Sequence, residues 1–223
     1  MTSIKSCHAL SLLPLVQGSA TAEPVVYVVD DDHAIRASLP SLLESVHLTV
    51  KAFASAHAFL EQFDPTQPGC LLLDVRMPGM SGLELQEKLL DEGRVIPIIF
   101  ISCYVDWPMA VRAMRKGAFD FLEKPFNDQH LLDTTQEALR LSVHLRNRQI
   151  LRDGAVARLA KISERERVVM DWMVTGKRSK EIAALLGLST KTVETHRANI
   201  MVKMEVKSVA ELVHLVWLSE CTG

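Results

Sequence analysis

The fold is decided by residues 70–82, which read CLLLDVRMPGMSG. A short apolar run ends in Asp74 and gives way at once to a segment rich in Pro and Gly, so the stretch predicts a strand followed by a turn. The buried strand holds the backbone of such a residue rigidly, while its carboxylate at the strand end is open to a ligand. Taken alone, however, an acidic strand end is usually a turn or a helix cap.

A second acidic strand end precedes the first. Residues 24–32 read PVVYVVDDD, a β-branched run that ends in Asp30, Asp31 and Asp32. If the two strands are parallel neighbours, their carboxylates share one pocket, where a pair about 4 Å apart costs about 4 kcal/mol at an effective dielectric near 20. Such a pocket recruits a divalent cation or raises a carboxyl pKa, and hard oxygen ligands favour Mg²⁺. Asp32 is instead interpreted as the cap of a following helix.

Two more apolar runs end in polar side chains. Residues 96–102 read IPIIFIS and bring the hydroxyl of Ser102 to a strand end, while residues 121–125 read FLEKP and bring Lys124. A hydroxyl donates to an anion, and the lysine ammonium can reach a carboxylate or a phosphoryl oxygen. The four strand ends therefore predict one polar site.

Short apolar runs alternate with helical segments along the first two thirds of the chain. This alternation predicts an α/β fold, a five-stranded doubly wound parallel sheet with the site at the carboxyl ends of its strands. The expected strands are 25–30, 48–53, 70–74, 96–101 and 119–122, and the expected helices are 33–46, 55–62, 82–91, 107–116 and 127–146.

The last third of the chain predicts a small all-α domain of four helices. Ser163 caps the first helix, Gly187 ends the second, Ser189 or Thr190 caps the third, and the fourth starts near Ser208. Apolar positions at helical spacing give a core face to the first, third and fourth helices. These positions are Val168, Val169, Trp172 and Met173 on the first, Val193, Ile200, Met201 and Met204 on the third, and Val209, Leu212, Val213, Val216 and Trp217 on the fourth. The tight turn after Gly187 is typical of a helix-turn-helix.

Charge divides the chain in the same place. Residues 1–145 hold 11 Lys+Arg and 18 Asp+Glu, a net of −7, whereas residues 146–223 hold 14 and 9, a net of +5. We expect an N-terminal extension at 1–23, an α/β domain at 24–145, a partly helical linker at 146–161 and the helical domain at 162–223. No apolar run is long enough to span a bilayer, and the four scattered cysteines fit a reducing cytoplasm, with Cys103 a small buried filler.

The motifs of residues 24–145 resemble the receiver domain of two-component response regulators. The resemblance rests on DD after the first strand, D before RMPGMSG, S after the fourth strand and KPF after the fifth. It implies that Asp74 is the phosphoacceptor and that Mg²⁺ is held by Asp30, Asp31, Asp74 and the backbone carbonyl of Arg76, with Asp30 acting through water.

The same resemblance gives roles to three further residues. Lys124 and Ser102 assist the transfer of the phosphoryl group, and Ser102 and Phe121 form the switch that responds to it. The loop from Ser102 to Asp106 lacks the Gly-rich character of close relatives, which puts the switching behaviour in question.

The helical domain is similar to the LuxR-type helix-turn-helix of the FixJ/NarL family. The segments ISERERVVM, KRSKEIAALLGLSTKTVETHRANIMVKM and KSVAELVHLV match in order over about 60 residues. The third helix is then expected to enter the major groove, with Glu194, Thr195 and Ala198 facing bases. The residues expected nearer the DNA backbone are Lys180, Lys191, Thr192, Arg197 and Lys203.

The leading hypothesis is a cytoplasmic response regulator without a separate enzymatic output. A sensor histidine kinase phosphorylates Asp74, and a homodimer then binds promoter DNA, with RNA polymerase as a further partner and no membrane contact. Two alternatives stay open. One is a phosphatase-like hydrolase with Asp74 as nucleophile, which the arginine at position 76 disfavours because such enzymes place a general acid there. The other is an atypical receiver that needs no phosphate.

Overall fold

The computed structural model describes residues 22–103 and 106–220, and the chain divides into two compact units between Thr135 and Gln136. The proposed extension at 1–23 therefore lies almost wholly outside the described residues, as do Tyr104 and Val105 of the loop after the fourth strand. No helix in the described part is both long enough and apolar enough to cross a membrane.

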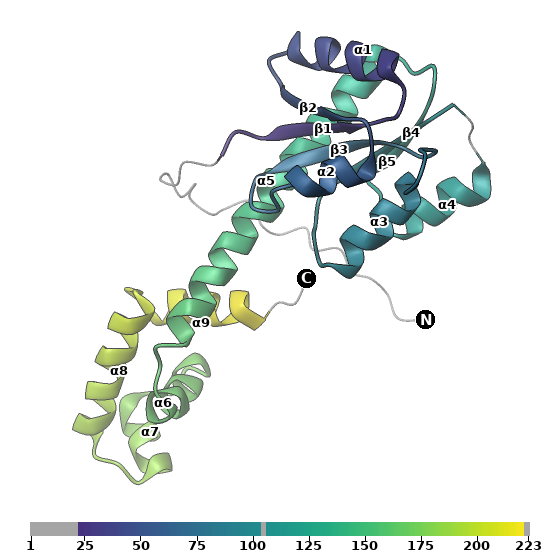
Figure 1. The fold of residues 1–223 in the computed structure, drawn as a ribbon. Helices are drawn as coiled ribbons and strands as arrows, with labels where there is room; N and C mark the ends of the chain where they lie inside the picture. Colours follow the sequence, from purple (N-terminus) through teal and green to yellow (C-terminus); the bar gives the residue numbers. More distant parts are fainter. Residues whose placement is uncertain (1–21, 104–105, 221–223) are drawn as a thin grey trace. The chain divides into compact units, whose positions relative to one another are not determined.

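The first unit is the predicted five-stranded parallel sheet with helices on both faces (Figure 1). The strands lie in the order β2-β1-β3-β4-β5, and every neighbouring pair is parallel. Their bounds are β1 Val25–Val29, β2 Thr49–Phe53, β3 Gly69–Asp74, β4 Ile98–Ser102 and β5 Asp120–Glu123. The helices of this unit are α1 His33–Glu44, α2 Ala56–Gln62, α3 Gly82–Asp91, α4 Trp107–Arg115 and the start of α5 Asp128–Leu159.

The sheet is covered on both sides, which is why its central strands are continuous apolar runs. In Figure 1, α1 and the start of α5 lie on one face, and α2, α3 and α4 lie on the other. A single apolar cluster fills the space beneath α2, α3 and α4, and its largest members include Tyr27, Phe59, Leu71, Leu85 and Phe100. Every residue of β1 and β3 is buried, so the two strands that carry the acidic ends are packed on both faces.

A glycine brings α3 against the end of β3. A Cβ atom at Gly82 would lie 2.3 Å from the backbone oxygen of Asp74, so only glycine allows this approach. Ser81 caps the helix, because its hydroxyl accepts from the backbone N–H of Glu84 while the Glu84 carboxylate accepts from the backbone N–H of Ser81. The turn that follows Asp74 is thus fixed by its own sequence.

The second unit contains the four predicted helices, α6 Glu164–Val174, α7 Ser179–Leu186, α8 Thr190–Met204 and α9 Val209–Glu220. Their shared core is built from Val169, Met170, Met173, Ile182, Val193, Ile200, Met204 and Leu212. Ser189 caps α8, and Gly187 ends α7 in a left-handed conformation at φ 66°, which a side chain would strain. The helix-turn-helix arrangement is therefore formed.

Three core positions were predicted wrongly. Val168 is 45% exposed, and Met170 takes its place in the core of α6. On α9, Val213 and Trp217 are 40% and 51% exposed, although Leu212 is fully buried. The apolar face of α9 is wider than the part of it that packs against the other helices of the unit. Periodicity alone does not show how much of an apolar face is buried.

The helix expected to end near residue 146 continues as α5 to Leu159. Gly154 lies inside it, and the space around this glycine is open, so the only cost is about 1 kcal/mol of helix propensity. Polar side chains four residues apart offset that cost, as in the hydrogen bond of 2.8 Å from Gln129 to Asp133 and that of 2.7 Å from Gln149 to Asp153. Low apolar density suggested a partly helical segment, but the whole of it is helical up to Leu159.

Candidate functional site

Two buried carboxylates meet at the carboxyl end of the sheet. Asp74 is the last residue of β3 and Asp30 follows β1, and these strands are hydrogen-bonded neighbours with Val29 opposite Leu73. Asp30 is 1% exposed and Asp74 is 7% exposed. The predicted pairing of two acidic strand ends is therefore present.

Lys124 joins the two carboxylates. Its Nζ lies 2.6 Å from Oδ2 of Asp30 and 2.8 Å from Oδ1 of Asp74, and its side chain is only 10% exposed. The lysine follows β5, and its backbone N–H donates to the carbonyl of Ser102 at the end of β4. Three strand ends thus contribute to one charged cluster with two negative charges and one positive charge.

Backbone donors fix the remaining oxygens of both carboxylates. Oδ2 of Asp74 accepts from the N–H of Arg76 at 2.7 Å, and Oδ1 of Asp30 accepts from the N–H of Asp32 at 2.8 Å. Arg36 also donates to the backbone carbonyl of Asp30 at 2.9 Å. Each carboxylate is consequently held in one orientation before any ligand arrives.

Burial and pairing shift the pKa values of this cluster. Burial raises the pKa of Asp30, and the hydrogen bonds from Lys124 and the backbone of Asp32 offset only part of that effect. Burial would lower the pKa of Lys124, but its hydrogen bonds to Asp30 and Asp74 outweigh it, and the pKa is raised. The lysine therefore stays cationic, which suits the stabilisation of an anion.

The oxygen atoms here fit Mg²⁺ better than a softer metal. Asp31 is exposed, and its carboxylate has no hydrogen-bond or ion-pair partner within the described residues. Over the same residues, no three metal-binding side chains of His, Cys, Asp or Glu are clustered. A small cation bound by two carboxylates, a carbonyl and several waters is consistent with this arrangement, because Mg²⁺ retains much of its hydration shell.

The two expected switch residues lie on neighbouring strands. Ser102 ends β4 and is 2% exposed. Phe121 lies opposite Phe100 in the β4–β5 pairing, is half-buried, and packs against that ring with centroids 6.1 Å apart. Both residues lie close to Lys124. The carbonyl of Ser102 accepts from its backbone N–H, and Phe121 precedes it by three residues in the sequence.

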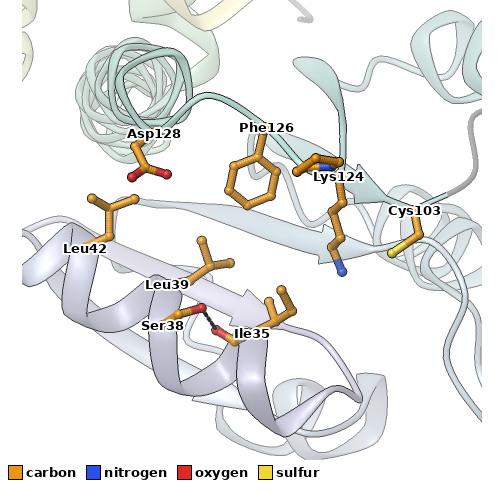
Figure 2. A pocket seen from close by; sticks show the side chains of 9 residues that line it. Ile35, Ser38, Leu39, Leu42, Cys103, Lys124, Phe126 and Asp128 are labelled. Carbon is orange, nitrogen blue, oxygen red and sulfur yellow. Dashed lines mark hydrogen bonds between the residues drawn. The ribbon is translucent and has the colours of Figure 1, made fainter.

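A groove of about 440 Å³ opens beside Lys124, between α1 and the segment after β5 (Figure 2). Ile35, Leu39 and Leu42 of α1 line one side, and Phe126 lies across from them. Cys103 also lines it and is exposed, so the prediction of a buried filler was wrong. The chain turns outward directly after Ser102, and a strand end gives no sequence signal of where that turn begins.

On the helical unit, most of the expected DNA-contacting residues are exposed. Lys180 lies on α7, and the exposed ones on α8 are Lys191, Thr192, Glu194, Thr195 and Ala198. Arg197 is half-buried, and its Nη1 lies 3.4 Å from the backbone oxygen of Lys177. The hydroxyl of Thr195 donates to the carbonyl of Lys191 at 3.0 Å. The Thr195 contact thus fixes a side chain of the exposed face of α8, whereas Arg197 is held nearer the core side of the helix.

Lys203 does not belong to that exposed face. Its Nζ lies 2.6 Å from Oε2 of Glu166, a residue of α6 that is 4% exposed. The same carboxylate accepts from the hydroxyl and the backbone N–H of Ser163. The hydrogen bond from Lys203, followed by those from Ser163, lowers the pKa of Glu166 to about 2.

The sequence pattern did not reveal Glu166 as a partner of α8. The Ser163–Glu166 spacing is a recognisable capping box, and that signal was available. Lys203 is 37 residues further along the chain, so only the packing of α6 against α8 pairs it with Glu166. We therefore expect Lys203 to hold Glu166 rather than a DNA phosphate.

Two family descriptions match the two units. Residues 26–136 match the response regulator receiver domain, and residues 160–216 match the bacterial regulatory proteins of the luxR family. Among similar proteins, the transcriptional regulatory protein TdiR of Thauera aromatica is 46% identical over 86% of this chain and 84% of its own length. FixJ of Azorhizobium caulinodans is 44% identical over 87% of this chain and 92% of its own length.

Two solved structures of response regulators are also similar over most of the chain. The low-resolution structure of the response regulator StyR is 46% identical, covers 88% of this chain and 99% of that chain, and has a TM-score of 0.81. Full-length FixJ from B. japonicum is 38% identical, covers 91% of this chain and 100% of that chain, and has a TM-score of 0.54. The chain belongs to the FixJ/LuxR family of response regulators, and it is a transcription regulator that joins a receiver domain to a DNA-binding domain.

Proposed function

We propose that Asp74 accepts a phosphoryl group from a sensor histidine kinase and that this modification controls promoter binding by α8. The observation that carries the proposal is the position of Lys124, whose Nζ contacts both Asp74 and Asp30 at 2.8 and 2.6 Å. An ammonium held at that point can offset the charge that develops on a transferring phosphoryl group.

The transfer follows from the orientation of Asp74. A carboxylate oxygen attacks the phosphorus of the kinase phosphohistidine in line, the P–N bond breaks, and the imidazole leaves. The backbone N–H of Arg76 holds one oxygen of Asp74 while Lys124 contacts the other. In this reading the chain is a phosphoryl acceptor without a separate enzymatic output.

Asp31, Asp74 and the backbone carbonyl of Arg76 would hold Mg²⁺, with Asp30 acting through water. When bound, the ion supplies positive charge that neutralises phosphoryl oxygens. Asp30 has a second role, because its carboxylate fixes the ammonium of Lys124 at 2.6 Å.

Ser102 and Phe121 would transmit the change. An acyl phosphate carries about two negative charges, and a hydroxyl at the end of β4 can donate to its oxygens. Phe121 is half-buried and packs against Phe100 on β4, the strand that Ser102 ends, and a shift of Ser102 would alter the space available to the ring. The surface formed by α4 and β5 would then differ between the two states.

In the output unit, α8 would lie in the major groove. Glu194, Thr195 and Ala198 would face bases. The phosphate contacts would come from Lys180, Lys191, Thr192 and Arg197, while Lys203 stabilises the unit through Glu166. Phosphorylation would favour a homodimer, since two copies of α8 on one two-fold axis read paired half-sites, and RNA polymerase would be the further partner at the promoter.

The test is phosphorylation of the full chain with acetyl phosphate and Mg²⁺, followed by intact mass. We expect one stable phosphoryl adduct in the wild type and in Asp91→Asn, which changes an exposed carboxylate outside the site, and none in Asp74→Asn. Steady release of phosphate without an adduct would favour the hydrolase. An unmodified chain under these conditions would favour a receiver that works without phosphate.

A further inference from the structure

One apolar residue of α8 belongs neither to the core nor to the proposed DNA contacts. Val202 is 75% exposed, whereas Val193, Ile200 and Met204 of the same helix are fully buried. Successive residues of a helix turn by about 100°, which places Val202 directly opposite those three residues. Its side chain thus lies on the outermost line of the helix.

That outermost line contains residues already proposed to meet DNA. Lys191, Thr195, Ala198 and Val202 follow one another at spacings of four, three and four residues, and all four are exposed. Ala198 and Val202 are one turn apart and form an apolar strip. Lys203, the next residue, turns away from this line to Glu166.

The chemistry of the major groove suggests what the strip contacts. Thymine C5-methyl is the apolar group that base pairs present there, and apolar side chains read it. A valine side chain has no hydrogen-bond donor and no charge, so it cannot bind a phosphate oxygen. Val202 lies about 10 Å along the helix from Thr195, a distance of about three base pairs at 3.4 Å each.

We propose that Ala198 and Val202 form a thymine-reading strip and that Val202 determines specificity at one end of each half-site. The inference rests on the proposed insertion of α8 into the major groove and deepens it, because it assigns a base to a residue that bears no hydrogen-bonding group. The flanking cations Lys180 and Lys191 would hold the duplex against this face through its phosphates.

The experiment replaces thymines one at a time by deoxyuridine, which lacks only the methyl group. The probes are duplexes selected from a random library by the phosphorylated full-length wild type, and affinity is measured by fluorescence anisotropy. At one thymine in each half-site we expect about fourfold weaker binding of the wild type, the value for one buried methyl-sized group. Val202→Ala should bind the thymine and uracil duplexes equally, while Val168→Ala, which alters an exposed valine of α6, should discriminate as the wild type does.

Three other results would overturn the inference. If Val202→Ala discriminates thymine from uracil as the wild type does while Thr195→Ala weakens binding, α8 reads DNA but the strip does not. If neither Thr195→Ala nor Lys191→Ala affects binding to any duplex, the proposed role of α8 fails and the inference with it. If Val202→Ala instead lowers self-association in sedimentation and leaves uracil sensitivity intact, the strip contacts a second copy of the chain.

Discussion

The Nζ of Lys203 lies 2.6 Å from Oε2 of Glu166, so the end of α8 is tied to the first turn of α6. Ser163 donates twice to the same carboxylate, through its hydroxyl and its backbone N–H. A buried carboxylate with three donors therefore fixes α8 against the rest of its unit.

We expect Lys203→Met to lower the free energy of unfolding of the helical unit by about 1.5–3 kcal/mol, the usual range for a hydrogen bond to a charged group. Urea titration followed by fluorescence of Trp172 and Trp217 measures this free energy, with Lys207→Met as the exposed control.

The salt dependence of DNA binding distinguishes an ion pair with Glu166 from a phosphate contact as the role of Lys203. Lys191→Met should reduce the slope of log K against log salt by about one, and Lys203→Met should leave it unchanged. A reduced slope of log K against log salt in Lys203→Met would instead show that this lysine contacts a DNA phosphate.

Acid should weaken the contact between Lys203 and Glu166 between pH 4.5 and 2. The pKa of Glu166 falls from an ordinary 4.5 to about 2 in the folded chain, so its contribution is complete above pH 4.5 and is lost as the pH falls towards 2. Unfolding free energies of the wild type and Glu166→Gln should therefore converge between pH 4.5 and 2. A constant difference across that range would mean that the carboxylate is not the group responsible.

Lys124→Met should slow phosphorylation by acetyl phosphate by about 10²-fold, because the site loses the donor that meets the developing charge. Its Mg²⁺ affinity should not fall, since the removed ammonium contacts Asp74, one of the proposed metal ligands. Rates of adduct formation by intact mass and calorimetric Mg²⁺ titrations give the two quantities, with Lys88→Met as an exposed control. An unchanged rate would exclude Lys124 from the transfer.

Asp31→Asn should weaken Mg²⁺ binding and phosphorylation together, because it replaces one of the two charged oxygens proposed for the ion. The exposed position of Asp31 means that folding should be unaffected. Calorimetry on the wild type, Asp31→Asn and the control Glu44→Gln measures the affinity. Equal affinity in all three proteins would move the metal site elsewhere.

Phosphorylation should strengthen promoter binding mainly by forming a dimer. Sedimentation of the full chain before and after acetyl phosphate treatment, with anisotropy on the selected duplexes, tests both parts. Asp74→Asn should remain monomeric and bind weakly under either condition. A wild type that binds equally well in both states as a monomer would contradict this form of control.

The succession of strands and helices along the chain, and the residues at the strand ends, follow from local sequence patterns. Uninterrupted apolar runs such as residues 70–73 specify buried parallel strands, and the expected strand boundaries lie within two residues of the observed ones. Local signals also specified the caps at Asp32 and Ser163 and the stop at Gly187, and they limited the cap of α8 to Ser189 or Thr190, of which the structure has Ser189. These features succeed because propensity, capping and periodicity act over a few neighbouring residues.

The contacts between side chains far apart in the sequence depend instead on how the elements pack. Lys124 contacts Asp30 across 94 residues of sequence, and Lys203 contacts Glu166 across 37. The exposure of Cys103 likewise depends on where β4 ends. A sequence pattern limits which face of a helix or strand is buried, but the partner of a charged group is set by packing, because a long side chain pairs with whichever opposite charge the fold brings within about 3 Å.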